Sequence, residues 1–455
     1  MTKKFYVVAL CMALSVLFLS FPVIAQESKV QSGKGVLEYE DFERPVTCKA
    51  CHLDIFRQWE QSMMSQAYTH HWDEVEYFKL AVPHAKNDPN VAEEVQEGCN
   101  GCHAPLAFLA GDVPPPHPGN SRADESVSCD ICHTIVSVDH ELPVNFNWSI
   151  DPGTRKRGPR TVGDAIQSPH HDMVFSDFHR TTEFCGSCHN EENPYGMMVK
   201  ATQIELLAGP YGEEGVRCHD CHMTNAPGTS AKMGNKHADV RQHLFHGGHD
   251  PGKVRGVVEL RIHPDIREAE PGDVVQFQVA LFNQKTGHKF PTGSVEDRIL
   301  WLHVEATDKA GNVYHLPVDP KGFDGEEMTI SADVLAYQDM AIPLGDPGFK
   351  GVQRDGVPFG DRIFRMPYLD SEGRMTIMQW NTTSFGVDYR LGPRETKLET
   401  FTFELPFEVE PGEMTITATL NYALLVKPVA DFLGAPEEGE TMVVNTHSTT
   451  INVLD

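Results

Sequence analysis

Five short segments of the chain repeat one arrangement of reactive side chains. In each segment two cysteines lie three positions apart and a histidine follows directly, as in Cys48-Lys49-Ala50-Cys51-His52. Two thiols at this spacing can form thioether bonds to the vinyl groups of a haem while the adjacent imidazole binds its iron. A single such pair also occurs in redox dithiols and zinc sites, but five identical copies predict five covalently bound haem c groups. The predicted attachment residues are Cys48 and Cys51, Cys99 and Cys102, Cys129 and Cys132, Cys185 and Cys188, and Cys218 and Cys221; the predicted proximal iron ligands are His52, His103, His133, His189 and His222.

The N-terminus has the pattern of a secretory signal peptide over residues 1–25. Two lysines precede an apolar run from Phe5 to Ile24, and Ala25 closes a small-residue cleavage site. The alternative is an uncleaved membrane anchor, because the run is close to the minimum length of a span. Cys11 lies inside this run, so after cleavage the ten remaining cysteines all belong to the five motifs. We therefore expect an exported protein, periplasmic or extracellular, with no later membrane segment, no disulfide and no catalytic thiol.

The charge of the chain restricts its partners. The formal net charge is −27, and removing two lysines with the signal brings the mature chain to −29. Such a protein is repelled by nucleic acid and anionic lipid, and it is attracted to redox partner proteins with basic docking surfaces. The one basic stretch, from Arg155 to Arg160, is interpreted as a solvated loop, or alternatively as a dock for an anion or partner.

The chain divides by composition near Pro251. Residues 26–45 are polar and predict a flexible arm. Residues 46–250 hold the motifs, with short helical patches between loops and little continuous apolar sequence, so haem faces must supply much of the core. Residues 251–455 contain no cysteine and show period-two alternation, which predicts an antiparallel β-sandwich with an irregular insertion at about 320–395. The expected fold class is α+β and multidomain.

Low-spin electron-transfer haems need a sixth ligand, usually His or Met. Histidines outside the motif positions that cluster in the haem region are the candidates, although many histidines are ordinary surface residues. These candidates are His70, His71, His84, His170, His171, His179, His243, His246 and His249.

The segments around the motifs resemble the cytochrome c-554-type multihaem family over about residues 45–250. The resemblance is carried by Trp59 to Ser62 after the first motif, Gly98 to Pro105, Val127 to Thr134, Ser168 to His171 with Phe184 to Asn190, and Cys218 to Met223. It implies that His171, His179 and His243 are distal ligands. A further segment, Gly287 to Gly293, resembles one found where such haem domains carry a β-sandwich, and it implies that His288 ligates a haem across the domain interface.

The chain departs from that family after the first motif. Met64 occupies the position where the family commonly has a distal histidine. Met64 can itself be the ligand, the pair His70–His71 can replace it, or one iron can remain five-coordinate and open to a small molecule.

Three functions fit these features. The first is an electron carrier without catalytic residues, in which electrons hop between closely packed haems. The second is an oxidoreductase acting on a small nitrogen or sulfur compound at an open iron, although no motif replaces its histidine with lysine. The third is a subunit of a conducting homo-oligomeric assembly.

Overall fold

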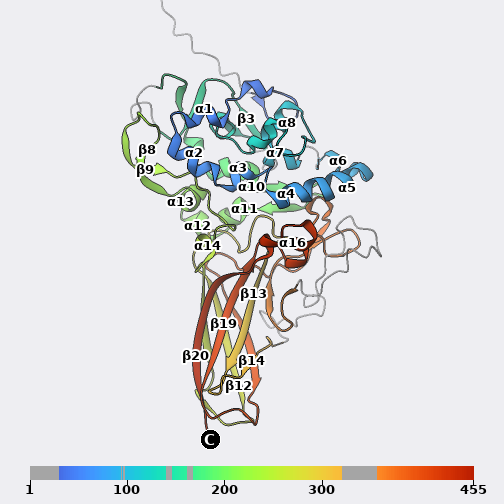
Figure 1. Ribbon diagram of the computed structural model, residues 1–455, viewed down its shortest axis with the longest axis vertical. Coiled ribbons are helices and arrows are strands. Elements are labelled where there is room, and N and C mark those ends of the chain that lie inside the picture. The colour runs from blue at the N-terminus through green and yellow to red at the C-terminus, as the bar shows by residue number, and fades with distance from the viewer. Residues whose placement is uncertain (1–29, 94, 96–97, 140–145, 161–167, 320–355) are drawn as a thin grey trace, which may run out of the picture.

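The computed structural model describes residues 30–93, 95, 98–139, 146–160, 168–319 and 356–455. The predicted signal peptide and the first part of the predicted insertion lie outside the described residues. A helical region is followed by a long β-sandwich that extends away from it, with the C-terminus near the far end (Figure 1). No described helix is both long and apolar enough to cross a membrane.

The helical region consists of short helices joined by loops and small sheets, as expected for a chain with few continuous apolar stretches. Helical patches of the predicted kind are present, as in the two short helices between Leu53 and Gln66, which Gln61 and Ser62 separate. The helices are α1 (Pro45–Lys49), α2 (Leu53–Glu60), α3 (Met63–Gln66), α4 (His71–Glu76), α5 (Val82–Asn87), α6 (Pro89–Glu93), α7 (Cys99–His103), α8 (Pro105–Ala110), α9 (Cys129–Thr134), α10 (Thr182–His189), α11 (Thr202–Leu207), α12 (Pro210–Glu213), α13 (Cys218–His222) and α14 (Pro251–Val254).

Small strand pairs connect these helices. Antiparallel pairing joins β3 to β1 and β2, β6 to β7, and β8 to β9, whereas β4 and β5 pair in parallel. Their bounds are β1 (Val30–Gln31), β2 (Ile135–Val138), β3 (Trp148–Ile150), β4 (Arg155–Gly158), β5 (Asp172–Phe175), β6 (Asn190–Glu192), β7 (Met198–Ala201), β8 (Asn225–Thr229) and β9 (Lys236–Arg241).

The segment expected to be a flexible arm is packed over its described part. Val30 pairs with Ile150 in the β1–β3 ladder, Phe42 is buried, and the Tyr39 hydroxyl donates to Asp112 at 2.9 Å. The arm prediction fails here because a few widely spaced apolar residues anchor the segment without producing any periodicity.

The basic stretch is also not a solvated loop. Arg155 to Gly158 form β4, and its cations pair with acids from neighbouring segments. Arg157 is buried against Asp151 at 2.5 Å, and Lys156 pairs with Asp130. The sequence prediction missed this because the compensating acids are distant from the cations along the chain or separated from them by a turn.

The β-sandwich consists of two sheets whose inner faces form the largest hydrophobic core. One sheet has the order β10–β12–β18, and the other has the order β11–β20–β19–β13–β14, with β15 also paired to β13. Alternate residues of β12 and β19 are buried, as the period-two pattern predicts, and the α+β multidomain fold class is confirmed. The bounds are β10 (Val258–Pro264), β11 (Glu268–Ala269), β12 (Val274–Asn283), β13 (Ile299–Thr307), β14 (Val313–His315), β15 (Arg362–Phe364), β18 (Thr396–Glu404), β19 (Gly412–Ala423) and β20 (Met442–Val453).

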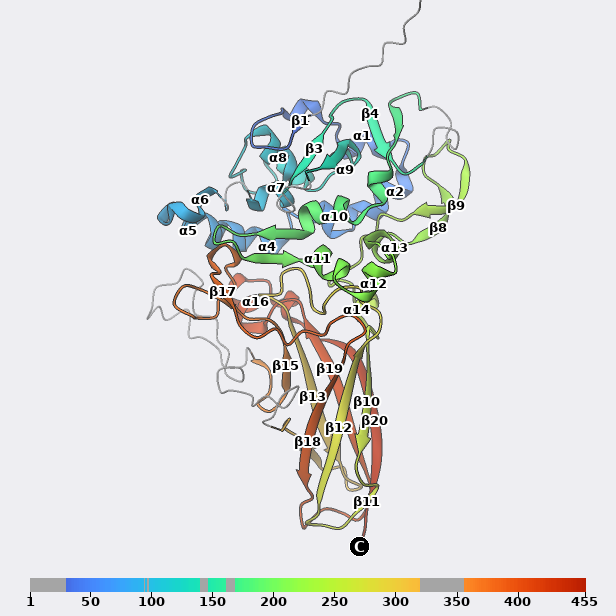
Figure 2. The same ribbon diagram turned by 180° about the vertical axis from the view of Figure 1, so that it is seen from behind.

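The described part of the predicted irregular insertion is well packed. It contains β15, the pair β16 (Tyr368–Leu369) and β17 (Ser384–Phe385), and a short helix at Gln379–Asn381. Tyr368, Ile377 and Trp380 are buried there, and together with α16 (Lys427–Leu433) this layer packs beneath the helical region (Figure 2). It therefore joins the two parts of the chain.

Candidate haem sites

One cavity of about 1760 Å³ runs through the helical region and reaches the sandwich. Cysteines or histidines from all five motifs line it, as do Met64, His171, His179, His243 and His288. The ten motif cysteines are all free thiols. A large, mainly apolar space that touches every motif is the environment that covalently attached porphyrins require.

Short helices place the reactive side chains of each motif on one side. Four motifs lie within single helices, namely α7, α9, α10 and α13. In the first motif Cys48 lies in the last turn of α1 and His52 caps α2. Residues three and four positions apart share a helix face. The two thiols and the imidazole of a motif therefore point to the same side.

Backbone carbonyls hold four of the five motif imidazoles, those of His52, His103, His133 and His222. The Nδ1 of His52 bonds to the carbonyl of Ser230 at 2.6 Å, and that of His133 bonds to Arg157 at 2.5 Å. His103 bonds in the same way to Ala67 at 2.7 Å, and His222 to His246 at 2.6 Å. A carbonyl only accepts, so the ring proton lies on Nδ1 and Nε2 carries the lone pair that binds iron.

Three motif imidazoles face a second imidazole across the cavity. The ring centres are 6.2 Å apart for His52 and His171, 6.4 Å for His133 and His243, and 6.4 Å for His222 and His288, with planes within 30° of parallel. With metal–nitrogen bonds of about 2.0 Å and ring centres about 1.1 Å behind each nitrogen, two imidazoles across one ion are about 6 Å apart. These pairs have the spacing of axial ligands.

The facing histidines are oriented in the same way as the motif histidines. The Nδ1 of His171, His243 and His288 bonds to the carbonyl of Asp172 at 3.3 Å, Arg241 at 3.1 Å and Lys289 at 2.9 Å, respectively. Each of them therefore presents Nε2.

His179 lies near His133, with ring centres 6.0 Å apart, but it is held differently. Its Nε2 bonds to the carbonyl of Cys132 and its Nδ1 to the hydroxyl of Ser176, both at 2.9 Å. Both nitrogens are thus engaged with protein atoms, and His243 is better placed to face His133.

The other sequence candidates lie elsewhere. His84 on α5 accepts the indole N–H of Trp380 at 3.0 Å and does not line the large cavity. His71 bonds to the carbonyl of Gly434, and His70 pairs with Glu438 at 3.0 Å, so both contact the sandwich side. Met64 lines the cavity, but His171 is the residue that faces the first motif.

The remaining three candidates differ in their surroundings. His249 lines the cavity, and its buried Nε2 makes no hydrogen bond among the described residues. His246 pairs with Asp250 at 2.9 Å, and its carbonyl holds His222. His170 is largely exposed.

Burial keeps the imidazoles neutral, which is the state that binds metal. Removal from water lowers the pKa of His222 and His243 to about 4, and it also lowers the pKa of His133, His189 and His288. A neutral ring is then present at physiological pH before any metal binds.

Thiols from different motifs lie next to one another. Hydrogen bonds join Cys48 to Cys129, Cys102 to Cys188, and Cys185 to Cys218. Through these contacts the first motif adjoins the third, the second adjoins the fourth, and the fourth adjoins the fifth. Burial and the nearby thiol of Cys188 raise the pKa of Cys132, so the third motif also lies near the fourth.

The second motif has a different environment. Within the part of the chain that is described, neither His103 nor His189 of the fourth motif makes a ring contact with a second imidazole, and the second motif differs from the fourth in the acids beside it. A small cavity of about 70 Å³ beside it is lined by Asp73, Glu76, Glu296, Asp297 and Lys200. Burial raises the pKa of Asp73, Glu76 and Asp297, which favours the protonated form of carboxyl groups close to this motif. No local pattern indicates this cluster, because its members come from three segments that are distant along the chain.

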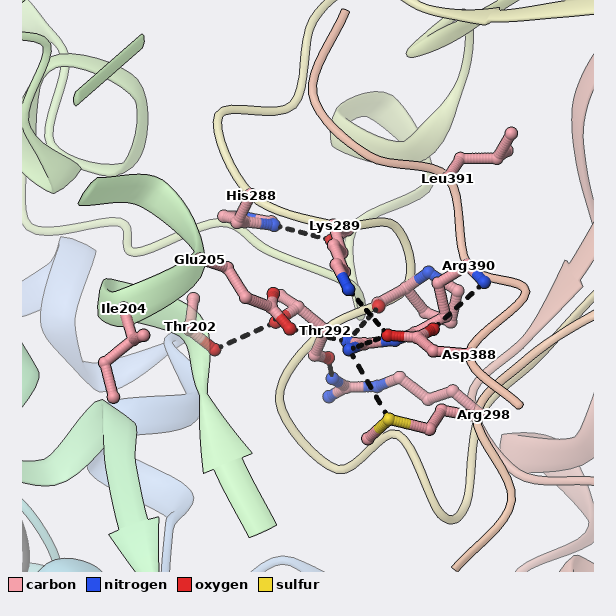
Figure 3. A network of polar contacts seen from close by, with 12 residues as sticks. Thr202, Ile204, Glu205, His288, Lys289, Thr292, Arg298, Asp388, Arg390 and Leu391 are labelled. Atoms are coloured by element: carbon pink, nitrogen blue, oxygen red, sulfur yellow. Dashed lines mark hydrogen bonds and ion pairs between the residues drawn. The ribbon is translucent and has the colours of Figure 1, made fainter. Parts of the chain in front are cut away.

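A network of buried charges fixes the loop that carries His288 against α11 (Figure 3). Arg390 pairs with Glu205 of α11 at 2.8 Å and with Asp388 at 2.9 Å. Glu205 accepts the hydroxyl of Thr292 at 2.7 Å, and Lys289 pairs with Asp388 at 2.7 Å. Burial opposes ionisation of Asp388, but hydrogen bonds from Arg390 and Lys289 lower its pKa to about 2.

Comparisons with known proteins agree with this arrangement. Residues 47–134, which contain the first three motifs, match the family described as cytochrome c554 and c-prime. The structure resembles a penta-haem cytochrome c552 from Thermochromatium tepidum, with a TM-score of 0.59 and 21% identity over 90% of this chain and 99% of that one. The match to Spo0M from Bacillus subtilis covers 44% of this chain and 50% of that one at 12% identity and a TM-score of 0.18, and it carries no argument. No curated protein matches the chain.

The family match and the fold match together support a multihaem c-type cytochrome family. The same two matches support covalent attachment of haem c and a role in haem-based redox chemistry.

Replacing Arg390 with methionine tests the network at the interface. The change leaves the largely buried carboxylate of Glu205 without its guanidinium and removes one of the two cations paired with half-buried Asp388. Breaking a buried ion pair costs about 3–5 kcal/mol. We expect a lower free energy of unfolding in urea, followed by circular dichroism. Arg394→Met is the matched control: its pair with Glu214 also joins the two regions but is exposed, so little change is expected. Equal effects of the two variants would contradict the assignment.

Proposed function

We propose that the chain binds five haem c groups, one at each motif, and transfers electrons between redox partners. Haem c supplies one-electron redox chemistry when bound. The residues of the chain attach the group through ten thiols, ligate it through five motif histidines, and exclude water by enclosing it.

We assign the distal positions from the facing rings. His171 would serve the first motif, His243 the third, and His288 the fifth. In each pair both Nδ1 atoms donate to backbone carbonyls, so both Nε2 atoms would be available to hold one iron. Two imidazole ligands give a low-spin centre that changes redox state without exchanging ligands, which suits electron transfer.

The observation that carries electron transfer is the contact between motifs. Thiols of different motifs lie within hydrogen-bonding distance, so groups attached to them would be neighbours. The first and third motifs would be linked through the fourth to the second and the fifth. A connected set of redox centres is what an electron conduit requires, and no substrate pocket is needed for it.

Export is part of the proposal. The predicted signal peptide over residues 1–25 and the use of all other cysteines in the motifs support a periplasmic or extracellular location. The high negative charge supports partners with basic docking surfaces.

A second function, reduction or oxidation of a small nitrogen or sulfur compound, is favoured by the acids beside the second motif. The ring of His103, like that of His189 in the fourth motif, has no facing imidazole among the described residues. Burial raises the pKa of Asp73, Glu76 and Asp297 beside His103, which favours protonated carboxyl groups that could donate protons to a bound substrate.

The number of haems is tested at the first motif. Changing Cys48 and Cys51 together to alanine removes one attachment site, so a pyridine haemochrome assay should find four haems per chain against five in the parent. Lys49→Ala lies between the same two thiols and should retain five. Five haems in the cysteine variant would show that the motif is not an attachment site.

The distal assignment is tested by two neighbouring histidines. His243→Ala should convert one haem from low spin to high spin, visible by electron paramagnetic resonance, because the third motif loses its second imidazole. His179→Ala removes a ring equally near His133 but with both nitrogens engaged, and it should leave the spin state unchanged. The reverse result would transfer the ligand role to His179.

The two functions are separated at the second motif. If its iron is open, the parent protein contains high-spin haem whose signal changes when nitrite or hydroxylamine is added. Asp73→Asn and Glu76→Gln should then slow turnover at least 10-fold while leaving the haem count unchanged. A protein with only low-spin haem and no response to either compound would leave electron transfer as the function.

A further inference from the structure

A cluster of two histidines and a carboxylate lies on the sandwich, outside the large cavity and its motifs. The Nδ1 of His303 contacts both carboxylate oxygens of Asp361 at 3.0 Å, and the Nε2 of His315 contacts one of them at 2.8 Å. The two rings are nearly parallel, at 9°, with centres 5.1 Å apart. The three side chains thus direct their ligand atoms toward one point.

The topology of the sheet builds this cluster. β13 pairs with β14 through Glu305 to Thr307 and with β15 through Leu300 to Leu302, so His303 lies between the two partner strands. His315 is the last residue of β14, and Asp361 directly precedes β15. Three strands therefore contribute one ligand each on the outer face of the sheet.

The backbone makes room for the carboxylate. Gly360 has a φ of +95°, and a Cβ at this position would lie 2.7 Å from Pro317 and 3.2 Å from His315. Only glycine allows the chain to approach His315 this closely in the left-handed conformation. The side chain of Asp361 is fully buried, whereas the imidazoles of His303 and His315 are 31% and 36% exposed, so solvent reaches one side of the cluster.

We propose that His303, His315 and Asp361 form a binding site for a divalent transition-metal ion such as Zn²⁺. Two imidazole nitrogens and one carboxylate oxygen are a common zinc ligand set, with water in the fourth position. All the ligand atoms lie within 4.8 Å of one another. Ligand atoms around a tetrahedral ion are about 3.3 Å apart, so the present hydrogen-bonded atoms need to separate by only roughly half an ångström.

Glu305 completes the arrangement as a positioning residue. Its carboxylate lies 3.7 Å from the Nε2 of His303, the nitrogen opposite the ligand atom. With a metal on Nδ1, neutral His303 would carry its ring proton on Nε2, and Glu305 could accept a hydrogen bond from it. A carboxylate in this position fixes the tautomer and orientation of a metal-bound histidine.

The ion would join distant parts of the chain. His315 and Asp361 lie at the two ends of the segment between β14 and β15, and His303 belongs to a central strand of the sheet. A bound metal would therefore tie both ends of that segment to the sandwich.

Zinc binding by the intact haem protein, without an affinity tag, tests the site. After equilibration with Zn²⁺ and dialysis, elemental analysis should find one zinc per chain, and calorimetry gives the affinity. The double variant His303→Ala/His315→Ala should lose this zinc with an affinity at least 100-fold lower, and Glu305→Gln should bind about 10- to 100-fold more weakly. His263→Ala, an exposed histidine on β10, should bind as the parent does.

Stability provides a second measurement that does not depend on redox activity. Zinc should raise the unfolding temperature of the parent but not of the double variant, because a ligand that binds only the folded state stabilises it. Unchanged haem absorption and circular dichroism would show that the variant folds. The proposal is overturned if the parent binds no zinc, or if the double variant retains zinc, as it would if the ion bound instead at His70, His249 and Glu438.

Discussion

Hydrogen bonds from imidazole Nδ1 to backbone carbonyls organise the helical region. They involve motif histidines and the histidines that face them, and the carbonyls come from segments far away in sequence, such as Ser230 for His52 and Arg157 for His133. Each bond fixes a tautomer, a ring orientation and the position of a loop together. A region with so little continuous apolar sequence depends on such bonds to place its loops around the cavity.

The β-sandwich extends away from the helical region, and it also contributes residues to the lining of the large cavity. The loop with His288 reaches the fifth motif, and buried pairs around Arg390 hold that loop against α11. A rigid β-domain with a large apolar core is suited to holding this loop. The ring of His288 would have to keep its position when a redox centre bound in the cavity gains or loses an electron. The same domain carries the separate cluster around Asp361, at a distance from the motifs along the chain.

Charges that the sequence presents as isolated are paired in the fold. The basic stretch from Arg155 becomes a strand whose cations meet Asp151 and Asp130, and its backbone supports His133. Widely spaced apolar residues dock the segment that follows residue 29. Periodicity is a local property, so it detected the long strands of the sandwich but missed these elements, which are stabilised by partners distant in sequence.

The sequence by itself determined the five repeated motifs of two cysteines and a histidine, and the change from helical to β structure near Pro251. These features depend on spacing within a few residues, which covalent geometry and strand periodicity specify directly. Only the tertiary structure decided which histidine faces which motif, that His243 presents a free nitrogen where His179 does not, and that His103 lies beside buried acids. Those properties depend on where loops separated by tens to hundreds of residues meet, and no local pattern encodes such contacts.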